Sequence, residues 1–265
     1  MEIGLSENAY FGKISMIKKL LFGTIIHLSD EMGVDTYPED ISPMFRWMQT
    51  LRLPPSPTIL DIGANVGLFS LSYAKMFKKA KIHAFEPVPF IYDYLKKNLE
   101  INPKLGSDID AHLFGMSNCI ECKQLSIPAA QQHERYNDQS DIRLFSVLGQ
   151  GTEKFDARFT TIDQWVDDFQ ISSVDFIKID VEGYEYSVLE GAINTLLSFQ
   201  PIVMFELNQL TLTLSNRTTT EYLRFAEDLN YNVFGLEYGY KTKLLKIASV
   251  EQLSLVSDLI IFPSQ

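Results

Sequence analysis

The chain has few cysteines, few basic residues and no long apolar run, and each shortage removes a class of protein. Its 265 residues include two cysteines, and 23 Lys and Arg stand against 34 Asp and Glu, a net charge of −11. The scattered basic residues form no phosphate-binding stripe, so we expect no nucleic-acid partner. No stretch is long enough to span a bilayer and no secretory signal is evident, so we expect a cytoplasmic protein without a transmembrane segment.

The two cysteines stand as Cys119-x-x-Cys122, a spacing found in redox pairs and in halves of zinc sites. A structural zinc needs four ligands, and the chain has no second cysteine pair. His112 and His133, the nearest histidines, do not stand at a zinc-site spacing. We therefore predict two ordinary thiols.

The apolar content of 46% is that of a globular protein with enough material for a sizeable core. We expect one α/β domain over 58–265, preceded by an N-terminal helical extension and linker over 1–57. Residues 12–28 have the pattern of an amphipathic helix, which would pack on the domain, on a second copy in a homo-oligomer, or on a membrane surface. A second short helix is predicted at 42–51, before a proline-rich linker.

From Thr58 onwards, short apolar runs alternate with helical patterns, which is typical of a doubly wound, mostly parallel sheet covered on both faces. Strands are predicted at 58–61, 81–85, 109–114, 175–180, 201–206, 232–236 and 259–262, the last ones supplying an antiparallel edge. Helices are predicted at 66–77, 90–98, 161–166, 184–197 and 220–229. Residues 118–155 break the rhythm, and we predict an insertion of strands and loops that contributes to a binding pocket.

The first of these strands enters a glycine-containing turn, and the second ends on a carboxylate. Gly63 and Gly67 let the backbone turn tightly and approach a ligand. Glu86 stands where an acidic side chain binds the two hydroxyls of a ribose. The pattern therefore predicts a nucleoside-cofactor site, and a plain strand-to-helix connection is the alternative.

The remaining residues of the turn indicate which nucleoside binds there. A dinucleotide fingerprint requires glycine where this chain has Asn65 and Leu68, so a pyrophosphate is disfavoured. Asp61 would repel a pyrophosphate, but it suits the ammonium or sulfonium of S-adenosyl-L-methionine. We therefore predict S-adenosyl-L-methionine as the cofactor.

Carboxylates follow four neighbouring strands, at the edge of a parallel sheet where ligands bind. They are Asp61, Glu86, the pair Asp180 and Glu182, and Glu206. Acidic side chains are rarely buried without partners, so the whole set indicates a functional site. The alternative, that each carboxylate caps a helix or turn, is credible for Glu182 and less so for the whole set.

Lys178-Ile-Asp-Val-Glu-Gly183, with Asp163-x-Trp165 before it and Pro201-Ile-x-x-x-Glu206 after it, resembles the FkbM family of S-adenosylmethionine-dependent methyltransferases. The resemblance covers about Thr58 to Asn208 and includes the glycine turn and Phe85-Glu-Pro87 in the expected order. It implies a class I methyltransferase (Rossmann-like) fold. It also implies O-methyl transfer to a hydroxyl of a small molecule, such as a sugar or secondary metabolite, or of a glycan.

The resemblance also implies roles for the cofactor-binding residues. Asp61 and Gly63 would face the methionine end, Ala64 and Asn65 would close the turn, and Glu86 would bind both ribose hydroxyls.

Many relatives of the wider fold carry an Asp at the adenine amine, where this chain reads Gly115-Met-Ser-Asn118. Ser117 is expected to serve instead, with Met116 packed on the adenine ring.

Asp180 stands where a base or metal ligand would be, with Glu182 as the alternative base. Lys178 is the third catalytic candidate, and its structural alternative is an ion pair with Asp180 or Glu206. Asp180, Glu206 and Asn208 would offer three oxygen ligands to a hard cation such as Mg²⁺, a layout that resembles catechol-type O-methyltransferases.

Two other functions stay open. A methyltransferase of this fold could act on an amine or a carboxylate, and a carboxylate acceptor needs no base. The second is a non-catalytic cofactor-binding or interaction module, which would have no physical need for so many carboxylates at one edge.

Overall fold

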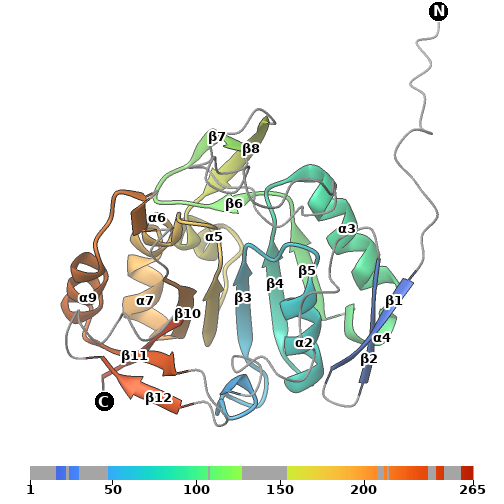
Figure 1. Ribbon diagram of the computed structural model, residues 1–265, viewed down its shortest axis with the longest axis horizontal. Coiled ribbons are helices and arrows are strands. Elements are labelled where there is room, and N and C mark those ends of the chain that lie inside the picture. The colour runs from blue at the N-terminus through green and yellow to red at the C-terminus, as the bar shows by residue number, and fades with distance from the viewer. Residues whose placement is uncertain are drawn as a thin grey trace, which may run out of the picture.

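An eight-stranded sheet forms the centre of the computed structural model, in the order β5-β4-β3-β9-β10-β13-β11-β12 (Figure 1). The structure describes residues 16–21, 24–29, 47–106, 108–126, 154–207, 212–213, 215–237, 243–247 and 258–264. The strands of the large sheet are β3 Thr58–Ile62, β4 Lys81–Phe85, β5 Ile109–His112, β9 Phe176–Ile179, β10 Ile202–Glu206, β11 Tyr231–Glu237, β12 Lys243–Lys246 and β13 Asp258–Pro263. Neighbours from β5 to β10 pair in parallel, and the pairs made by β13, β11 and β12 are antiparallel. The predicted mostly parallel α/β fold with an antiparallel edge is confirmed.

Helices cover both faces of this sheet, as expected when the residues of the central strands are buried on both sides. The helices are α2 Leu68–Met76, α3 Pro89–Glu100, α4 Pro103–Gly106, α5 Ile162–Asp168, α6 Glu185–Glu190, α7 Ile193–Phe199 and α9 Thr219–Asp228. Successive residues of a strand enter different cores: Ile59 packs in the core that includes α2 and α3, and Leu60 packs in the core that includes α5 to α9. The two cores fix which side chains of β3 and β9 face α2.

The predicted helix over 184–197 is two helices, because the chain bends at Gly191. A Cβ atom at Gly191 would lie 2.0 Å from the backbone oxygen of Ser117, so this glycine allows a close contact between two backbones. The free N–H groups at the start of the second helix, α7, find an acceptor in Asp163. Its carboxylate accepts hydrogen bonds from the backbone nitrogens of Asn194 and Thr195 at 2.9 and 2.8 Å. Thr161 caps α5 as predicted, with its Oγ1 2.9 Å from the backbone nitrogen of Gln164.

The predicted N-terminal helix over 12–28 is wrong where the structure describes it. Residues Met16–Leu21 (β1) and Thr24–Ser29 (β2) form an antiparallel hairpin, and β2 lies beside α3 (Figure 1). Thr24, Ile25 and Ile26 are β-branched, and such residues favour extended backbone over helix. Of the helix predicted at 42–51, residues 47–48 are helical and residues 42–46 lie outside the described residues.

A small three-stranded sheet, in the order β6-β8-β7, lies beyond the end of β5 (Figure 1). Its strands are β6 Gly115–Met116, β7 Glu121–Ser126 and β8 Lys154–Thr160. The predicted insertion over 118–155 thus contributes β7 and the start of β8, and residues 127–153 lie outside the described part. Cys119 and Cys122 are both free and exposed.

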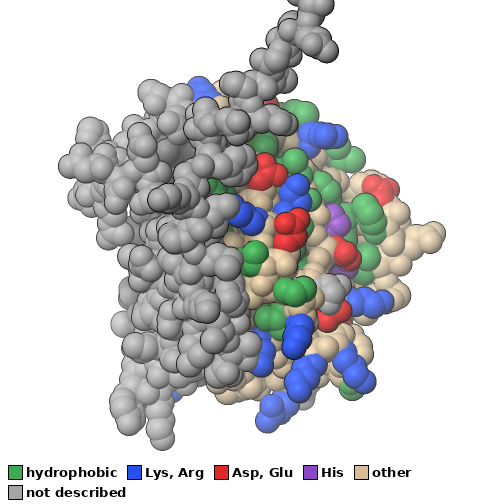
Figure 2. All heavy atoms as spheres, turned by 90° about the vertical axis from the view of Figure 1, so that its right-hand side faces the viewer, with side chains coloured by type: hydrophobic (Ala, Val, Ile, Leu, Met, Phe, Trp, Pro, Cys, Tyr) green, Lys and Arg blue, Asp and Glu red, His purple; other side chains and the backbone are tan. Residues whose placement is uncertain are grey.

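Figure 2 shows the side of the molecule that carries α3 and β5. Lys and Arg side chains gather toward its lower end, and hydrophobic, histidine and acidic side chains are mixed above them. Residues 68–106, which include α2 to α4, hold seven lysines and three carboxylates in a chain of net charge −11.

No helix in the described ranges is long and apolar enough to cross a membrane.

Candidate active site

The candidate site lies where the strand order reverses, between β3 and β9. Ligands of open α/β sheets bind beyond the carboxyl ends of the strands at such a point. The backbone nitrogens of Gly63 and Ala64, which follow β3, donate to the Phe85 oxygen at 3.0 and 2.9 Å. Gly63 has a φ of 78°, and a Cβ atom there would lie 1.9 Å from the backbone carbonyl oxygen of Asp180. Only glycine fits a turn that brings three strand ends together.

The rest of the glycine turn packs inside the protein. Gly67 has a φ of 87°, and a Cβ atom there would lie 2.6 Å from Cδ1 of Leu95 on α3. The structure therefore places Gly67 against a neighbouring helix. Asn65 has a φ of 50°, and its Oδ1 accepts a hydrogen bond from the Val66 nitrogen at 2.8 Å. Ala64 is buried.

Glu86 follows β4, and each of its two carboxylate oxygens accepts a backbone hydrogen bond, one from the glycine turn and one from the start of α3. Oε2 accepts a hydrogen bond from the Asn65 nitrogen at 3.0 Å, and Oε1 accepts one from the Val88 nitrogen at 2.9 Å. Burial raises the pKa of Glu86 to about 7, against the opposing effect of these two hydrogen bonds. Each carboxylate oxygen can accept a second hydrogen bond, so the oriented carboxylate suits a pair of hydroxyl donors.

Asp61 and Lys178 face each other across the pair β3 and β9, beneath α2. They are register partners, with Oδ1 of Asp61 3.6 Å from Nζ of Lys178, and their side chains are 0% and 3% exposed. From α2, Ser70 donates to Oδ2 of Asp61 at 2.6 Å, and the ring of Phe69 lies 4.3 Å from Nζ. Burial raises the pKa of Asp61, and Lys178 and Ser70 oppose the shift. Asp61 is therefore an internal ion-pair partner in this structure.

Lys178 joins this pair to the carboxylates that follow β9. Its Nζ lies 3.1 Å from Oδ2 of Asp180, whose side chain is 33% exposed. Of the two partners predicted for Lys178, Asp180 is thus present in an ion pair. The ammonium sits between a buried carboxylate and a half-buried one, so it acts on the site through Asp180.

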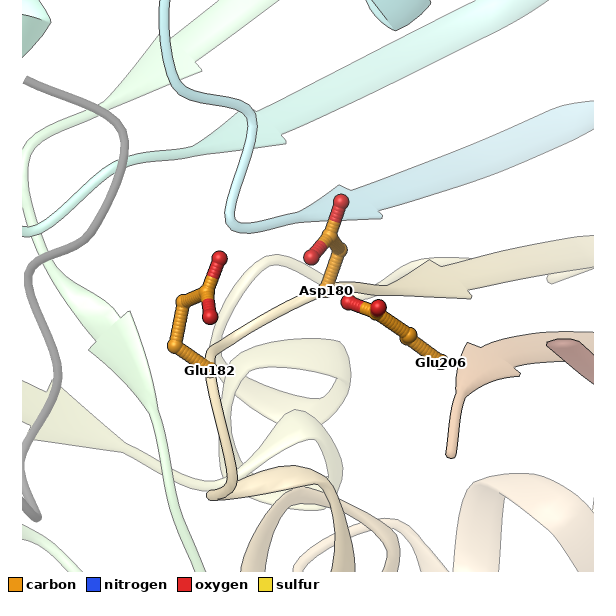
Figure 3. A group of neighbouring side chains, drawn as sticks. All are labelled: Asp180, Glu182 and Glu206. Carbon is orange, nitrogen blue, oxygen red and sulfur yellow. The ribbon is translucent and has the colours of Figure 1, made fainter. Parts of the chain in front are cut away.

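Asp180, Glu182 and Glu206 converge at the ends of β9 and β10 (Figure 3). One oxygen of each carboxylate lies within 4.8 Å of the other two. Burial raises the pKa of Glu182 well above its usual range, and Asp180 and Glu206 raise it further. Asn208, the third predicted metal ligand, lies outside the described residues. The cluster therefore brings together the two predicted bases, Asp180 and Glu182, and two of the three predicted metal ligands, Asp180 and Glu206.

The two residues predicted at the adenine are enclosed by protein. Met116 is 1% exposed and packs in the core that includes α5 to α9. The Ser117 hydroxyl lies 3.0 Å from Oε1 of Glu121 and 3.4 Å from the Tyr184 hydroxyl, which also contacts Nζ of Lys123. Ser117 therefore links β7 to the residue that follows the Asp180–Gly183 turn, and its contact with adenine stays a prediction.

Sequence reasoning missed three side chains that shape the site: Ser70 and Phe69 on α2, and Glu185 on α6. Ser70 and Phe69 stand three and two residues after Gly67, so one turn of the predicted helix could have placed them over Asp61. Glu185 follows Gly183 by two residues, and an acidic residue at a helix start is a recognisable signal.

Comparison with known proteins adds a family to this geometry. The family model described as methyltransferase FkbM domain matches residues 61–233. Methyltransferase sdnD of Sordaria araneosa is 32% identical over 161 residues, which cover 53% of this chain and 62% of sdnD. The 2-O-methyltransferase NoeI of Sinorhizobium fredii is 25% identical over 162 residues, covering 57% of this chain and 63% of NoeI.

A third relative and one solved structure extend the comparison. The hexuronic acid methyltransferase AglP of Haloferax volcanii is 25% identical over 144 residues, covering 54% of this chain and 53% of AglP. The crystal structure of methyltransferase FkbM from Methylobacillus flagellatus has a TM-score of 0.50 at 19% identity, covering 80% of this chain and 45% of that one. The chain thus spans less than two thirds of each of these relatives, and the solved structure supports the fold. Because the family match extends over more than half of the chain and includes the glycine turn, Glu86 and the carboxylate cluster, the protein belongs to the methyltransferase FkbM domain family.

Proposed function

We propose that the protein is an S-adenosyl-L-methionine-dependent O-methyltransferase that acts on a hydroxyl of a sugar, glycan or secondary metabolite. The observation that carries the proposal is Glu86, a buried carboxylate oriented by two backbone N–H groups beside the glycine turn. The name of NoeI, a 2-O-methyltransferase, supports transfer to oxygen, and the name of AglP, a hexuronic acid methyltransferase, supports a sugar derivative as the acceptor.

The residues present fit the proposed cofactor. Glu86 would bind the two ribose hydroxyls, and the backbone of Gly63 and Ala64 would line the methionine end. Oδ1 of Asp61 is buried beneath the turn and makes no hydrogen bond in the described residues, although the Lys178 ammonium lies 3.6 Å away. When bound, the cofactor supplies an activated methyl group on a positively charged sulfur, and the surrounding carboxylates complement that charge.

The chain's own contribution to transfer is to orient the acceptor and to accept its proton. We assign Asp180 as the base, because it is half-buried, accessible and ion-paired with Lys178. Burial and the neighbouring carboxylates raise the pKa of Glu182 and so favour its protonated form, which could donate a hydrogen bond to the acceptor. Two neighbouring carboxyl groups with different environments thus take two different roles.

The same cluster is the place to test for Mg²⁺. Three carboxylates repel one another, and either a proton on Glu182 or a divalent cation relieves the repulsion. If a cation does so, methyl transfer will be lost in EDTA and restored by Mg²⁺, and Glu206→Gln will abolish that restoration. If activity is unchanged in EDTA, no divalent cation is needed, and a proton on Glu182 would then be what relieves the repulsion.

The proposal is tested by methyl transfer from labelled S-adenosyl-L-methionine to a panel of hydroxylated acceptors, with amine and carboxylate analogues of each. We expect label on oxygen, and a loss of at least about 100-fold in Asp180→Asn, the contribution typical of a general base. The labelled position is then identified by mass spectrometry. Label that appears on nitrogen or on a carboxylate, with Asp180→Asn unaffected, would contradict the assignment.

A further inference from the structure

The turn that carries Glu182 has a disfavoured backbone conformation. Glu182 and Gly183 have consecutive positive φ values of 55° and 99°. Glycine adopts such values freely, but a glutamate does so only where the surrounding structure holds it there. A specific contact must therefore maintain this turn.

Glu185, the first residue of α6, makes that contact. Its Oε1 accepts hydrogen bonds from the backbone nitrogens of Val181 at 3.2 Å and Gly183 at 3.1 Å, the residues on either side of Glu182. The side chain belongs to a residue that is 1% exposed. One buried carboxylate oxygen thus joins both ends of the turn, and water has little access to replace it.

We infer that Glu185 is the positioning residue of the carboxylate cluster: it fixes the turn so that the Glu182 side chain projects toward Asp180 and Glu206. Figure 3 shows the carboxyl group of Glu182 beside those of Asp180 and Glu206. The catalytic consequence of this inference rests on the proposed function, whereas its structural consequence does not.

Asp163 provides a matched comparison. It is also a carboxylate that accepts hydrogen bonds from two backbone N–H groups, those of Asn194 and Thr195. These two groups lie at the start of α7, separated along the chain from the Glu182 turn by α6. Loss of Asp163 should weaken the fold and leave the turn at Glu182 intact. The two residues therefore separate a general effect on stability from an effect on the position of Glu182.

The structural test is amide hydrogen exchange at Val181 and Gly183, measured by NMR on the whole chain. We expect the exchange of these two amides to become about tenfold faster or more in Glu185→Ala. In Glu185→Gln, which keeps an acceptor oxygen, their exchange rates should stay close to those of the wild type. Glu185→Asp is a milder variant, whose shorter carboxylate cannot reach both amides, and it should quicken the same two. Asp163→Ala should quicken Asn194 and Thr195 instead. Unchanged exchange at Val181 and Gly183 in both Glu185→Ala and Glu185→Asp would overturn the inference.

The catalytic test uses an acceptor that the wild type methylates. We expect Glu185→Asp to lower kcat at least about tenfold, with the acceptor KM and the dissociation constant of S-adenosyl-L-methionine within about twofold of wild type, because only alignment is lost. Glu185→Gln should restore kcat, and Asp163→Ala should leave it unchanged. Equal loss of kcat in Glu185→Asp and Asp163→Ala would reduce Glu185 to a fold-stabilising residue. A wild type without any methyl transfer would count against the proposed function, and the exchange result would still decide the role of Glu185.

Discussion

The buried pair of Asp61 and Lys178 shows why single residues of this site must be read together with their partners. Each alone would be a costly buried charge, and the cross-strand register brings them to 3.6 Å. The sequence predicts Asp180 or Glu206 as the ion-pair partner of Lys178. The structure shows the pair with Asp180, and the pair with Asp61 was not predicted. Pairing between β3 and β9 depends on the register of two strands far apart in the sequence, and periodicity does not specify that register.

Replacing Lys178 tests this pair directly. Lys178→Met would leave Asp61 as an uncompensated buried carboxylate, so the free energy of unfolding should fall by about 3 to 5 kcal/mol. Adding Asp61→Asn to Lys178→Met removes that charge and should recover most of the loss. Urea unfolding of the single and double variants measures both. A double variant no more stable than Lys178→Met alone would show that the ion pair is not the cause.

The role proposed for Glu86 predicts that cofactor binding depends on pH. Its pKa of about 7 in the folded protein means that the carboxylate is ionised above neutral pH and protonated below it. Only the ionised form can accept hydrogen bonds from two hydroxyls with both oxygens. The affinity for S-adenosyl-L-methionine should therefore fall as pH decreases through 7, by roughly tenfold between pH 7 and pH 6 at most. Calorimetry at pH 6 and pH 8 measures the change, and equal affinities at the two values would contradict it.

At the scale of elements, the sequence predicts what lies in regular, buried strands and misses what depends on contacts between elements. The strands β3, β4, β9 and β10 are predicted within about one residue, because buried parallel strands are short apolar runs between helical patterns. The break at Gly191 is missed, since it follows from a contact with Ser117 that no local pattern encodes.

The N-terminal hairpin is missed for a different reason. A segment that mixes Lys with Ile and Leu fits an amphipathic helix and an edge hairpin equally well. Short apolar runs are ambiguous in this way, and in the structure this segment pairs as a hairpin beside α3. The carboxylates of the site are predicted more reliably, because each follows an apolar strand directly, and parallel strands end at the same edge of the sheet.

The glycine turn between β3 and α2 is the element on which the site depends most. Gly63→Ala would place a Cβ atom 1.9 Å from the Asp180 oxygen, in a backbone that cannot move without shifting β9. Gly67→Ala would meet the flexible end of Leu95 at 2.6 Å. Both share the cost of a positive φ, about 1 to 2 kcal/mol, and Gly63→Ala should cost more than Gly67→Ala because of its backbone clash.

Thermal unfolding of the two glycine variants, together with wild type, measures this difference. Gly63→Ala should show the larger fall in Tm and should also lose cofactor affinity, because the Asp180 backbone is displaced. Equal falls in Tm would mean that the turn relaxes around the added methyl group.

At the scale of the whole molecule, buried carboxyl groups link folding to pH. Burial raises the pKa of Glu86 from 4.5 to about 7, so the folded protein binds a proton that the unfolded chain releases. The stability from this group is fully present below pH 4.5 and is lost as pH rises through 7. His112 acts in the opposite direction, because burial lowers its pKa from 6.5 to about 4.

The effect of Glu86 is therefore measured as a difference between wild type and Glu86→Gln, in which the opposing histidine contribution cancels. Relative to Glu86→Gln, wild type should lose up to about 3 kcal/mol of unfolding free energy between pH 4.5 and pH 8. Urea unfolding at several pH values gives this difference. A difference that stays constant with pH would show that the Glu86 pKa is not raised in the folded state.

The central claim is that the sheet edge at β3 and β4 binds S-adenosyl-L-methionine through Glu86. Calorimetric titration of wild type and Glu86→Ala with S-adenosyl-L-methionine, and separately with NAD, tests it most directly. Binding of S-adenosyl-L-methionine by wild type, its loss in Glu86→Ala, and no binding of NAD are the predicted results. Binding of NAD alone, or equal binding of S-adenosyl-L-methionine by both proteins, would contradict the account.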